Sequence, residues 1–459
     1  MIRASWMAIF AALASACAAS GTTELWPASG QSPAPVGSGR PPVDGSPAPP
    51  CTPQPADDGA SVYVAPTGAD DAACGARTSP CKTVQQGIER AHAQNKAAVL
   101  VARGRYVESI TLRAGLDVHG GWDVQGGAWT QTCASDATVI QPPADKSVAV
   151  TADTLGGAAS LTSLSIASKD HAALRHNESV VGVFARGAST SLTLAYVVVA
   201  TGNGGDGDIG DTGLDGDGGG STCAAGSGAS GTAAGARGAG ATAGQWSSDG
   251  FAPTAGLGGV KGVPGQNGSG PGKGACVACV GCNSPGDGSC SAYSDGNSCG
   301  RDGTAGCGGE GGNGGGGGKS GGSAIALFAW DAHVTLVGGS LTAGDGGHGG
   351  AGGPGGNGGA GGAGGAGGDA TPCAISCASY LGVCTGAFNK QSGAGGAAGG
   401  RGGQGALGGV GGGGGGGASF AMVTGGDSNV EKHGTTLAHG SAGKPAQGGA
   451  PGQAGDVGP

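Results

Sequence analysis

The segment "SAIALFAWDAHVTLVGGSLTAGDGG", residues 323–347, contains the pattern that decides the fold. It begins with an apolar run, continues with a short strand-like run, and ends with a third short run before Gly344. The same order recurs in "SVVGVFARGASTSLTLAYVVVATGNGG", residues 179–205, and in "ASFAMVTGGDSNVEKHGTTLAHGSAG", residues 418–443. Repeats of this kind are typical of a solenoid, because each coil can bury its apolar residues only by stacking on its neighbours.

The region before these repeats combines one helix with short strands. Apolar residues at helical spacing predict an amphipathic helix over 83–93, with Val84, Ile88 and Ala91 on one face. Short strand-like runs are expected at 62–64, 98–102, 109–112, 116–119, 146–150 and 161–166.

Residues 61–123 also resemble a known family. The pieces "VYVAPTG", "SPCKTVQQGIERA", "VLVARGRYVESITL" and "LDVHGGWD" follow one another in this order. Together they resemble the N-terminal cap and first coil of right-handed parallel β-helix proteins of the pectate-lyase-like superfamily. The resemblance implies an all-β fold, a right-handed parallel β-helix, for the coils of this chain.

Glycine, 112 of 459 residues, recurs at every third position between the coils. The phase holds over 204–219, 300–321, 346–367 and 393–417. A flexible tether has no reason to keep such a phase, whereas a polyproline-II-type helix has three residues per turn and places every third residue along one edge. Only glycine fits where that edge touches a neighbouring helix. The phase therefore predicts polyglycine II hairpins inserted between the coils, with disorder as the alternative.

The insertions have lengths that suit hairpins. The first is long enough for four arms and the second for two, which gives about seven arms with the C-terminal tract. Such a bundle resembles the polyglycine II bundles of some antifreeze proteins and phage tail-tip adhesins, and its composition resembles the glycine-rich PGRS type. The predicted segments are 1–17 (signal peptide), 18–60 (Pro/Gly/Ser-rich linker), 61–201 (cap and first coils), 202–322 (first insertion), 323–343 (coil), 344–417 (second insertion), 418–439 (coil) and 440–459 (glycine-rich tail).

The N-terminus "MIRASWMAIFAALASACAAS" indicates export. A small-residue box that ends in Cys17 resembles a bacterial lipoprotein signal, in which the cysteine is lipidated. The resemblance implies an outer-membrane or cell-surface lipoprotein held by a lipid anchor, and cleavage to a secreted protein is the alternative. The net charge of −9 argues against nucleic acid as a partner.

An exported chain is expected to pair its cysteines. The chain has 15 cysteines, and without Cys17 fourteen are available to form disulfides. The disulfide candidates are Cys51, Cys74, Cys81, Cys133, Cys223, Cys276, Cys279, Cys282, Cys290, Cys299, Cys307, Cys373, Cys377 and Cys384. The first insertion holds seven of them and the second holds three. If the four before residue 134 pair among themselves, a disulfide joins the two insertions or two thiols stay free.

No set of catalytic residues stands out. A glycosidase needs two carboxylates that flank the scissile bond, and no coil supplies such a pair. Arg175 and His176 suit a polar turn rather than a catalytic role. Gly347-His348-Gly349 lies within a glycine tract and is not a catalytic motif there. Disulfides are favoured over metal for "CVACVGC". The candidate ligands for a Ca²⁺ cofactor are Asp206, Asp208, Asp211, Asp215 and Asp217, with a solvated acidic edge as the alternative.

The sequence thus predicts an exported, surface-tethered structural or binding protein. Recognition is expected at disulfide-stapled loops on a rigid scaffold, where Tyr293, Tyr380 and Phe388 are the candidate contact residues. The expected role is adhesion, or recognition of carbohydrate or another cell surface. A polysaccharide-active β-helix enzyme is the first alternative, and a passive envelope or ice-interacting protein is the second.

Overall fold

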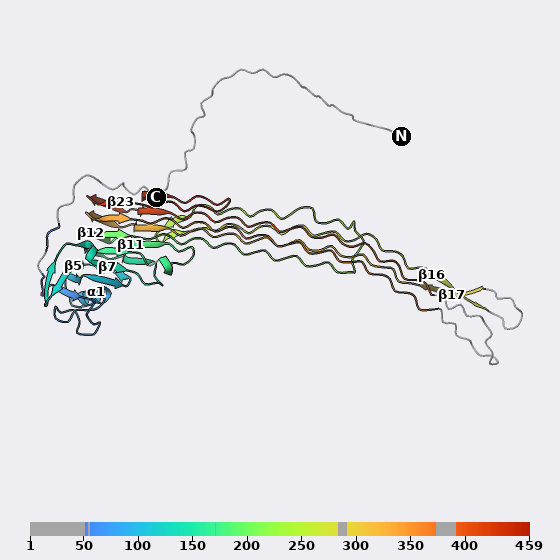
Figure 1. Ribbon diagram of the computed structural model, residues 1–459, viewed down its shortest axis with the longest axis horizontal. Coiled ribbons are helices and arrows are strands. Elements are labelled where there is room, and N and C mark those ends of the chain that lie inside the picture. The colour runs from blue at the N-terminus through green and yellow to red at the C-terminus, as the bar shows by residue number, and fades with distance from the viewer. Residues whose placement is uncertain (1–50, 54–55, 170, 283–291, 373–391) are drawn as a thin grey trace, which may run out of the picture. The chain divides into compact units, whose positions relative to one another are not determined.

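The computed structural model describes residues 51–53, 56–169, 171–282, 292–372 and 392–459. Three stacked β-sheets form its body (Figure 1). The first sheet contains β1 (Ser61–Val64), β2 (Ala98–Ala102), β5 (Asp117–Gln125), β9 (Gly157–Thr162), β12 (Thr190–Ala195), β19 (His333–Val337) and β22 (Asn429–His433), with β6 (Ala128–Gln131) antiparallel to β5.

The second sheet contains β3 (Gly104–Val107), β7 (Thr138–Gln141), β10 (Ser165–Ala167), β13 (Val198–Ala200), β20 (Ser340–Thr342) and β23 (Thr436–Ala438). The third sheet contains β4 (Ile110–Thr111), β8 (Val148–Asp153), β11 (Val180–Arg186), β18 (Ala324–Trp330), β21 (Ser419–Gly425) and β24 (Ala454–Gly458).

Each repeat in the sequence is one turn of this stack. The segment that opens with "SAIALFAW" gives β18 to the third sheet, β19 to the first and β20 to the second, and all pair in parallel with the turns before and after. Leu327 pairs with Val183 below and Met422 above, and all three side chains are fully buried. The predicted parallel β-helix is confirmed by these sheets, which are consistent with the right-handed form.

Helix α1 (Val84–Ala93) covers the first turn, as the sequence predicted. Its Thr83 N-cap accepts a hydrogen bond from the backbone of Gln86, and its buried face packs on β1 and β2. Gly87 lies in that face because a β-carbon there would come within 2.4 Å of a Val64 methyl group. The short 3-10 helices η1 (Ser135–Ala137) and η2 (His171–Ala173) occupy turns.

Some strand boundaries differ from the prediction. The expected run at 161–166 is divided between β9 and β10, because Ser163 adopts a left-handed φ of 52° that turns the chain into the next sheet. The hairpins formed by β14 (Gln245–Ser247) with β15 (Gly250–Ala252), and by β16 (Cys276–Cys282) with β17 (Ala292–Cys299), were not predicted. Both lie within the first glycine-rich insertion, where no strand periodicity marks them.

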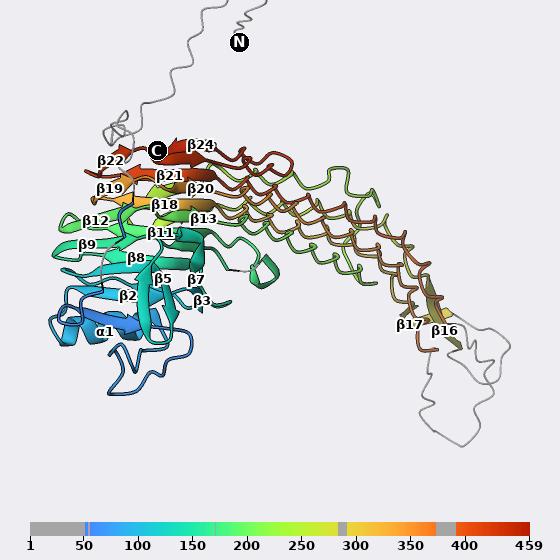
Figure 2. The same cartoon turned by 60° about the vertical axis from the view of Figure 1, so that its left-hand side comes forward.

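All long insertions leave the β-helix at the same corner (Figure 2). Residues 201–323 connect β13 to β18, residues 343–418 connect β20 to β21, and residues 439–453 connect β23 to β24. Each therefore begins at the second sheet and returns to the third. Successive insertions start one turn apart, which places their outgoing segments next to one another.

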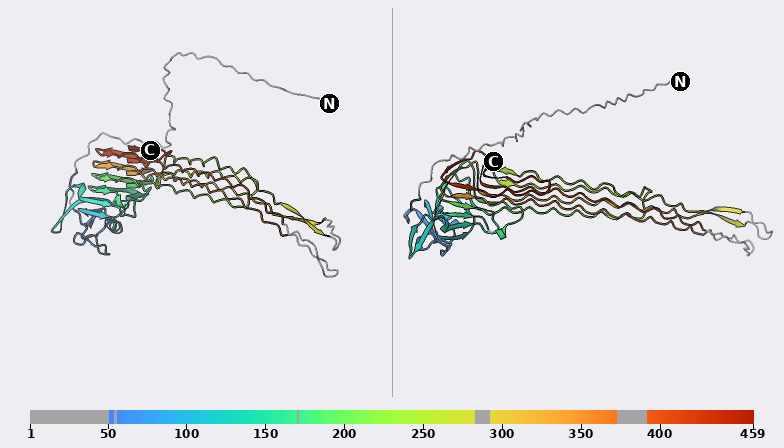
Figure 3. Two further views of the ribbon diagram at one scale, coloured as in Figure 1. Left: turned by 45° about the vertical axis from the view of Figure 1, so that its right-hand side comes forward. Right: turned by 45° about the horizontal axis from the view of Figure 1, so that its top comes forward.

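The insertions form extended arms that run side by side (Figures 1 and 3). We number the six long arms in chain order, arm 1 to arm 6: residues 202–222, 224–244, 253–275, 300–322, 344–372 and 392–417. Odd-numbered arms run away from the β-helix and even-numbered arms run back. Along arm 1, the backbone N–H groups of Gly204, Gly207 and Gly210 donate to successive carbonyls of arm 5 at 2.7–2.9 Å. This three-residue interval recurs between the other neighbouring arms.

Glycine is most frequent in the arms with the most neighbours. Arm 1 is bonded to arms 4 and 5, and over residues 206–217 one residue in three is glycine. Arm 4 is bonded to arms 1, 3, 5 and 6, and glycine fills most positions at two residues in three. A β-carbon on Gly315 of arm 4 would lie 2.0 Å from the carbonyl oxygen of Gly353. The second glycine in each triplet thus reflects a second face in backbone contact.

The β-helix sets the register of the arms. Val198 of β13 pairs with Ser340 of β20, a separation of 142 residues, and the same separation relates Asn203 of arm 1 to its partner Asp345 of arm 5. Ala324 of β18 pairs with Ser419 of β21, 95 residues apart, and Ser320 of arm 4 bonds Gly415 of arm 6 at the same separation. The arms continue the strand register beyond the sheets.

Candidate binding sites

Four disulfides lie within the described residues: Cys51–Cys133, Cys74–Cys81, Cys223–Cys307 and Cys276–Cys299. Multiple disulfides indicate an extracytoplasmic protein. Within the described ranges, no helix is both long and apolar enough to cross a membrane. Cys17, Cys290, Cys373, Cys377 and Cys384 lie outside the described residues, so the predicted lipidation and the predicted disulfide between the insertions stay predictions.

The far ends of the arms carry the predicted recognition loops. Cys276–Cys299 closes the β16–β17 hairpin at the end of arms 3 and 4. The second insertion reaches the same place, because Ser298 Oγ donates to the carbonyl of Thr371 at 2.8 Å and Ala275 N–H donates to Ala394. Tyr293 lies on β17 opposite Gly281, whereas Tyr380 and Phe388 lie outside the described residues. The starts of the two loops are therefore neighbours.

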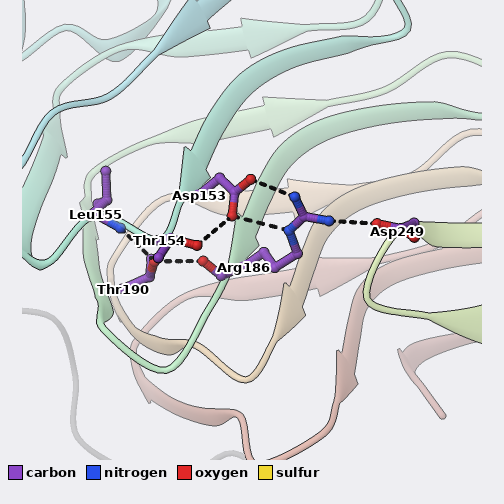
Figure 4. A network of polar contacts seen from close by, with 6 residues as sticks. All are labelled: Asp153, Thr154, Leu155, Arg186, Thr190 and Asp249. Atoms are coloured by element: carbon purple, nitrogen blue, oxygen red, sulfur yellow. Dashed lines mark hydrogen bonds and ion pairs between the residues drawn. The ribbon is translucent and has the colours of Figure 1, made fainter.

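A clamp holds arms 2 and 3 to the β-helix at their near end. The β14–β15 hairpin joins these arms, and Trp246 in β14 packs on the outer face of the third sheet, with ring centroids 6.4 Å from Phe328 and 5.8 Å from Phe420. Arg186 of β11 reaches Asp249 in the turn of the hairpin at 2.5 Å and Asp153 of β8 at 2.5 Å (Figure 4). One guanidinium thus links two turns of the β-helix to the first insertion.

A cleft of about 460 Å³ opens where the outgoing arms leave the β-helix. We call it the root cleft. Four stretches line it, one from the turn before β11, one from arm 1, one from arm 5 and one from the segment after β23. Its charged and imidazole side chains are Arg175, His176, Asp206, Asp345, His348 and Lys444.

Side chains in the root cleft bond to the backbone of the next arm. Asn203 Oδ1 accepts from Asp345 N–H at 2.8 Å, and Asp345 Oδ1 accepts from Ser441 N–H at 2.7 Å. One triplet further out, Asp206 Oδ1 accepts from His348 N–H at 2.7 Å, and His348 Nδ1 accepts from Lys444 N–H at 3.0 Å. Because His348 Nδ1 is an acceptor, the proton of its neutral ring lies on Nε2.

A buried ion pair holds the turn before β11, which forms one wall of the root cleft. Lys169 Nζ lies 2.5 Å from Glu178 Oε1, and only 1% of the lysine side chain is exposed. Glu178 Oε2 accepts from Arg175 N–H at 2.9 Å, so the same carboxylate holds the turn that presents Arg175 and His176. These two residues, expected from sequence to form a polar turn, do so at the edge of a cleft.

The five aspartates considered for Ca²⁺ do not form one group. Asp206 and Asp215 accept backbone N–H bonds from arm 5, and Asp208 accepts from the side-chain amide of Asn177. In the part of the chain that the structure describes, the only group of three or more potential metal ligands is Asp70, Cys74 and Cys81. Those two cysteines form a disulfide and are not available as thiolates. Cys276 of "CVACVGC" is likewise disulfide-bonded.

Sequence reasoning missed most of the root cleft. It treated His348 as one residue of a glycine tract, and it did not single out Asn203, Asp345, Ser441 or Lys444. A signal was present, because the first three of these follow Gly202, Gly344 and Gly440 in the aligned repeats. Equivalent positions in stacked coils become neighbours in space.

A second cavity, of about 510 Å³, lies on the outer face of the first sheet. Leu100, His119, Trp122 and Tyr196 line it together with the segment that begins at Cys51. The Cys51–Cys133 disulfide ties that segment to the residues after β6. Burial lowers the pKa of His119 below its ordinary value, although the charge of Asp117 opposes this shift.

No family model matches this chain, and no curated protein matches it. Among solved structures it is similar to the pectin methylesterase PemA from Erwinia chrysanthemi, with 16% sequence identity and a TM-score of 0.20. The similarity covers 34% of this chain and 54% of that one, so this chain spans about half the length of the enzyme. The fold assignment rests on the three sheets of this protein, and the comparison carries nothing about its activity.

Proposed function

We propose that this protein is an exported display protein in which a β-helix base and a stiff stalk of polyglycine II arms present recognition loops. The observation that carries the proposal is the series of inter-arm hydrogen bonds at every third residue. At about 3.1 Å per residue, such bonds tie neighbouring arms together roughly every 9 Å. An arm tied to several neighbours at this interval bends only if many bonds break together.

Three attachments support a fixed direction for the stalk. The arms continue the register of the sheets, the Trp246 clamp holds arms 2 and 3, and Cys223–Cys307 joins the turn between arms 1 and 2 to arm 4. Loops at the end of such a support are kept apart from the base, which suits contact with a large partner. The proposed partner is a glycan or another cell surface.

The base is proposed to be tethered through a lipid on Cys17 to the outer membrane or cell surface. The Pro/Gly/Ser-rich residues 18–60 would then separate the β-helix from that anchor. Tyr293, Tyr380 and Phe388 are the proposed contact residues of the loops, because aromatic side chains supply rigid contact area.

The test compares binding of the protein to a glycan array and to intact cells. A Cys17→Ala form of the full chain serves as the parent, so that lipidation does not interfere. One variant replaces residues 283–291 with a short Gly/Asn-rich turn, and a second replaces residues 374–390 in the same way. Loss of binding in either variant, with unchanged circular dichroism, supports the proposal. Full binding by both variants would overturn it, and release of new sugar ends from a polysaccharide would favour the enzyme alternative.

A further inference from the structure

We infer that the root cleft is a second binding site, distinct from the loops, and that it takes a neutral saccharide. The site is composite, because arm 1, arm 5 and the segment after β23 each contribute two polar positions. It exists only when the outgoing arms stack in register. Nothing in the proposed display role requires such a cleft.

The polar groups of the cleft are pre-oriented. Asp206, Asp345 and His348 each use one side-chain atom to bond the neighbouring backbone. Each therefore keeps a second polar atom in a fixed position: a carboxylate oxygen on each aspartate and the Nε2 proton on the histidine. Groups held in place before binding lose little rotamer freedom on binding.

Charge balance selects a neutral ligand. Arg175 and Lys444 contribute two cations and Asp206 and Asp345 contribute two carboxylates. An anion would meet both carboxylates, and a cation would meet both basic side chains. The potential ligand atoms of the cleft do not come together as a metal-binding group, since the one such group in the described residues lies at Asp70.

The mixture of donors and acceptors suits hydroxyl groups. A hydroxyl both donates and accepts, so a row of hydroxyls can bond a carboxylate oxygen and a guanidinium or ammonium group in turn. Leu174 is the one large apolar side chain that lines the cleft, so a peptide would find few contacts for its apolar side chains. The volume of about 460 Å³ suits a ligand of one or two sugar units.

The experiment titrates the Cys17→Ala full chain with cellobiose, maltose and lactose, and with a galacturonic acid dimer as the anionic probe. Amide shifts in a ¹H–¹⁵N spectrum report where each sugar binds. Arg175→Ala and Lys444→Ala remove free cationic groups and leave the backbone bonds intact. Asp345→Asn keeps the oxygen that accepts from Ser441 and changes the free one. Arg237→Ala, an exposed arginine on arm 2, is the matched control.

At least one neutral sugar is expected to shift the amide signals of residues 203–206, 345–348 and 441–444. The affinity for that sugar should fall about tenfold or more in each cleft variant and stay unchanged in Arg237→Ala. Absence of shifts there for every sugar would overturn the inference, as would equal affinity of cleft variants and parent. Binding of the anionic dimer alone, strengthened by Asp345→Asn, would overturn the neutral class. The loop-replaced variants should keep this binding, which separates failure of this site from failure of the proposed display function.

Discussion

Gly353→Ala is the most direct test of backbone contact between the arms. Gly353 lies inside arm 5, where its N–H donates to Gly316 at 2.8 Å and its carbonyl accepts from Gly411 at 2.9 Å. A β-carbon added there would lie 2.0 Å from the carbonyl oxygen of Asp211 in arm 1. That oxygen is backbone and cannot rotate away, so arm 1 has to move.

The size of the effect follows from the distances. Ordinary contact begins at 3.4 Å, so relief needs a shift of roughly 1.4 Å, the difference between 3.4 and 2.0 Å. The bonds from Gly210 to Ala351 and from Gly213 to Pro354, at 2.9 and 2.8 Å, flank the clash and would be lost. At about 1 kcal/mol each, the local cost is about 2 kcal/mol, or roughly a 30-fold increase in amide exchange.

Hydrogen exchange followed by mass spectrometry measures this effect, and Gly368→Ala is the matched control. Gly368 lies on the same arm, and a β-carbon there meets nothing within 4 Å. The control should leave exchange unchanged or slow it slightly, because alanine restricts the unfolded chain. Equal effects of the two substitutions, or unchanged exchange in arms 1 and 5 of Gly353→Ala, would refute the packing argument.

Four further outcomes are expected. Trp246→Ala removes the ring contacts of the clamp and should weaken docking of the β14–β15 hairpin by about 2 kcal/mol, seen as faster proteolysis at residues 245–252 with the β-helix intact. The Arg186 hydrogen bond holds the pKa of Asp153 below its ordinary value of 3.8. The stabilisation from this ion pair is therefore present above pH 3.8 and is lost as the pH falls through the lower pKa of Asp153 in the folded protein. Protection of the hairpin from exchange should fall in that acid range, and Asp153→Asn should weaken this dependence. Glu108→Ala removes the carboxylate that accepts from Val84 and Gln85 N–H at the start of α1, and should lower stability by about 1–2 kcal/mol in thermal unfolding. Mass mapping should find a disulfide between the two insertions, since each has three cysteines outside the described bridges; bridges confined to single insertions, with two free thiols, would contradict this.

Much of the fold could be predicted because its signals are local or periodic. The helix at 83–93 follows from apolar spacing, and the coils follow from three aligned repeats. The clamp could not be predicted. Trp246 lies in a glycine-rich segment, and its partners on the third sheet, Phe328 and Phe420, are more than 80 residues away.

The candidate sites also differ in how far the sequence could predict them. The loops at the ends of the arms follow from cysteine and aromatic residues between glycine tracts, which can be seen in the sequence. The root cleft depends on the spatial meeting of residues 206, 348 and 444, whose separations are set by the lengths of two insertions. A residue-by-residue search for catalytic or metal-binding motifs does not find such a set, because each member belongs to a different coil.

The sequence by itself determined that this protein is a solenoid with glycine in a three-residue phase, because repeats and periodicity are properties of the chain order. Only the tertiary structure decided which arms are neighbours, which face of each is buried, and which side chains share a cleft. The physical reason is that the arms have no apolar core of their own. Their order is set by the register of the sheets from which they emerge and by backbone hydrogen bonds, which any residue with an N–H can make.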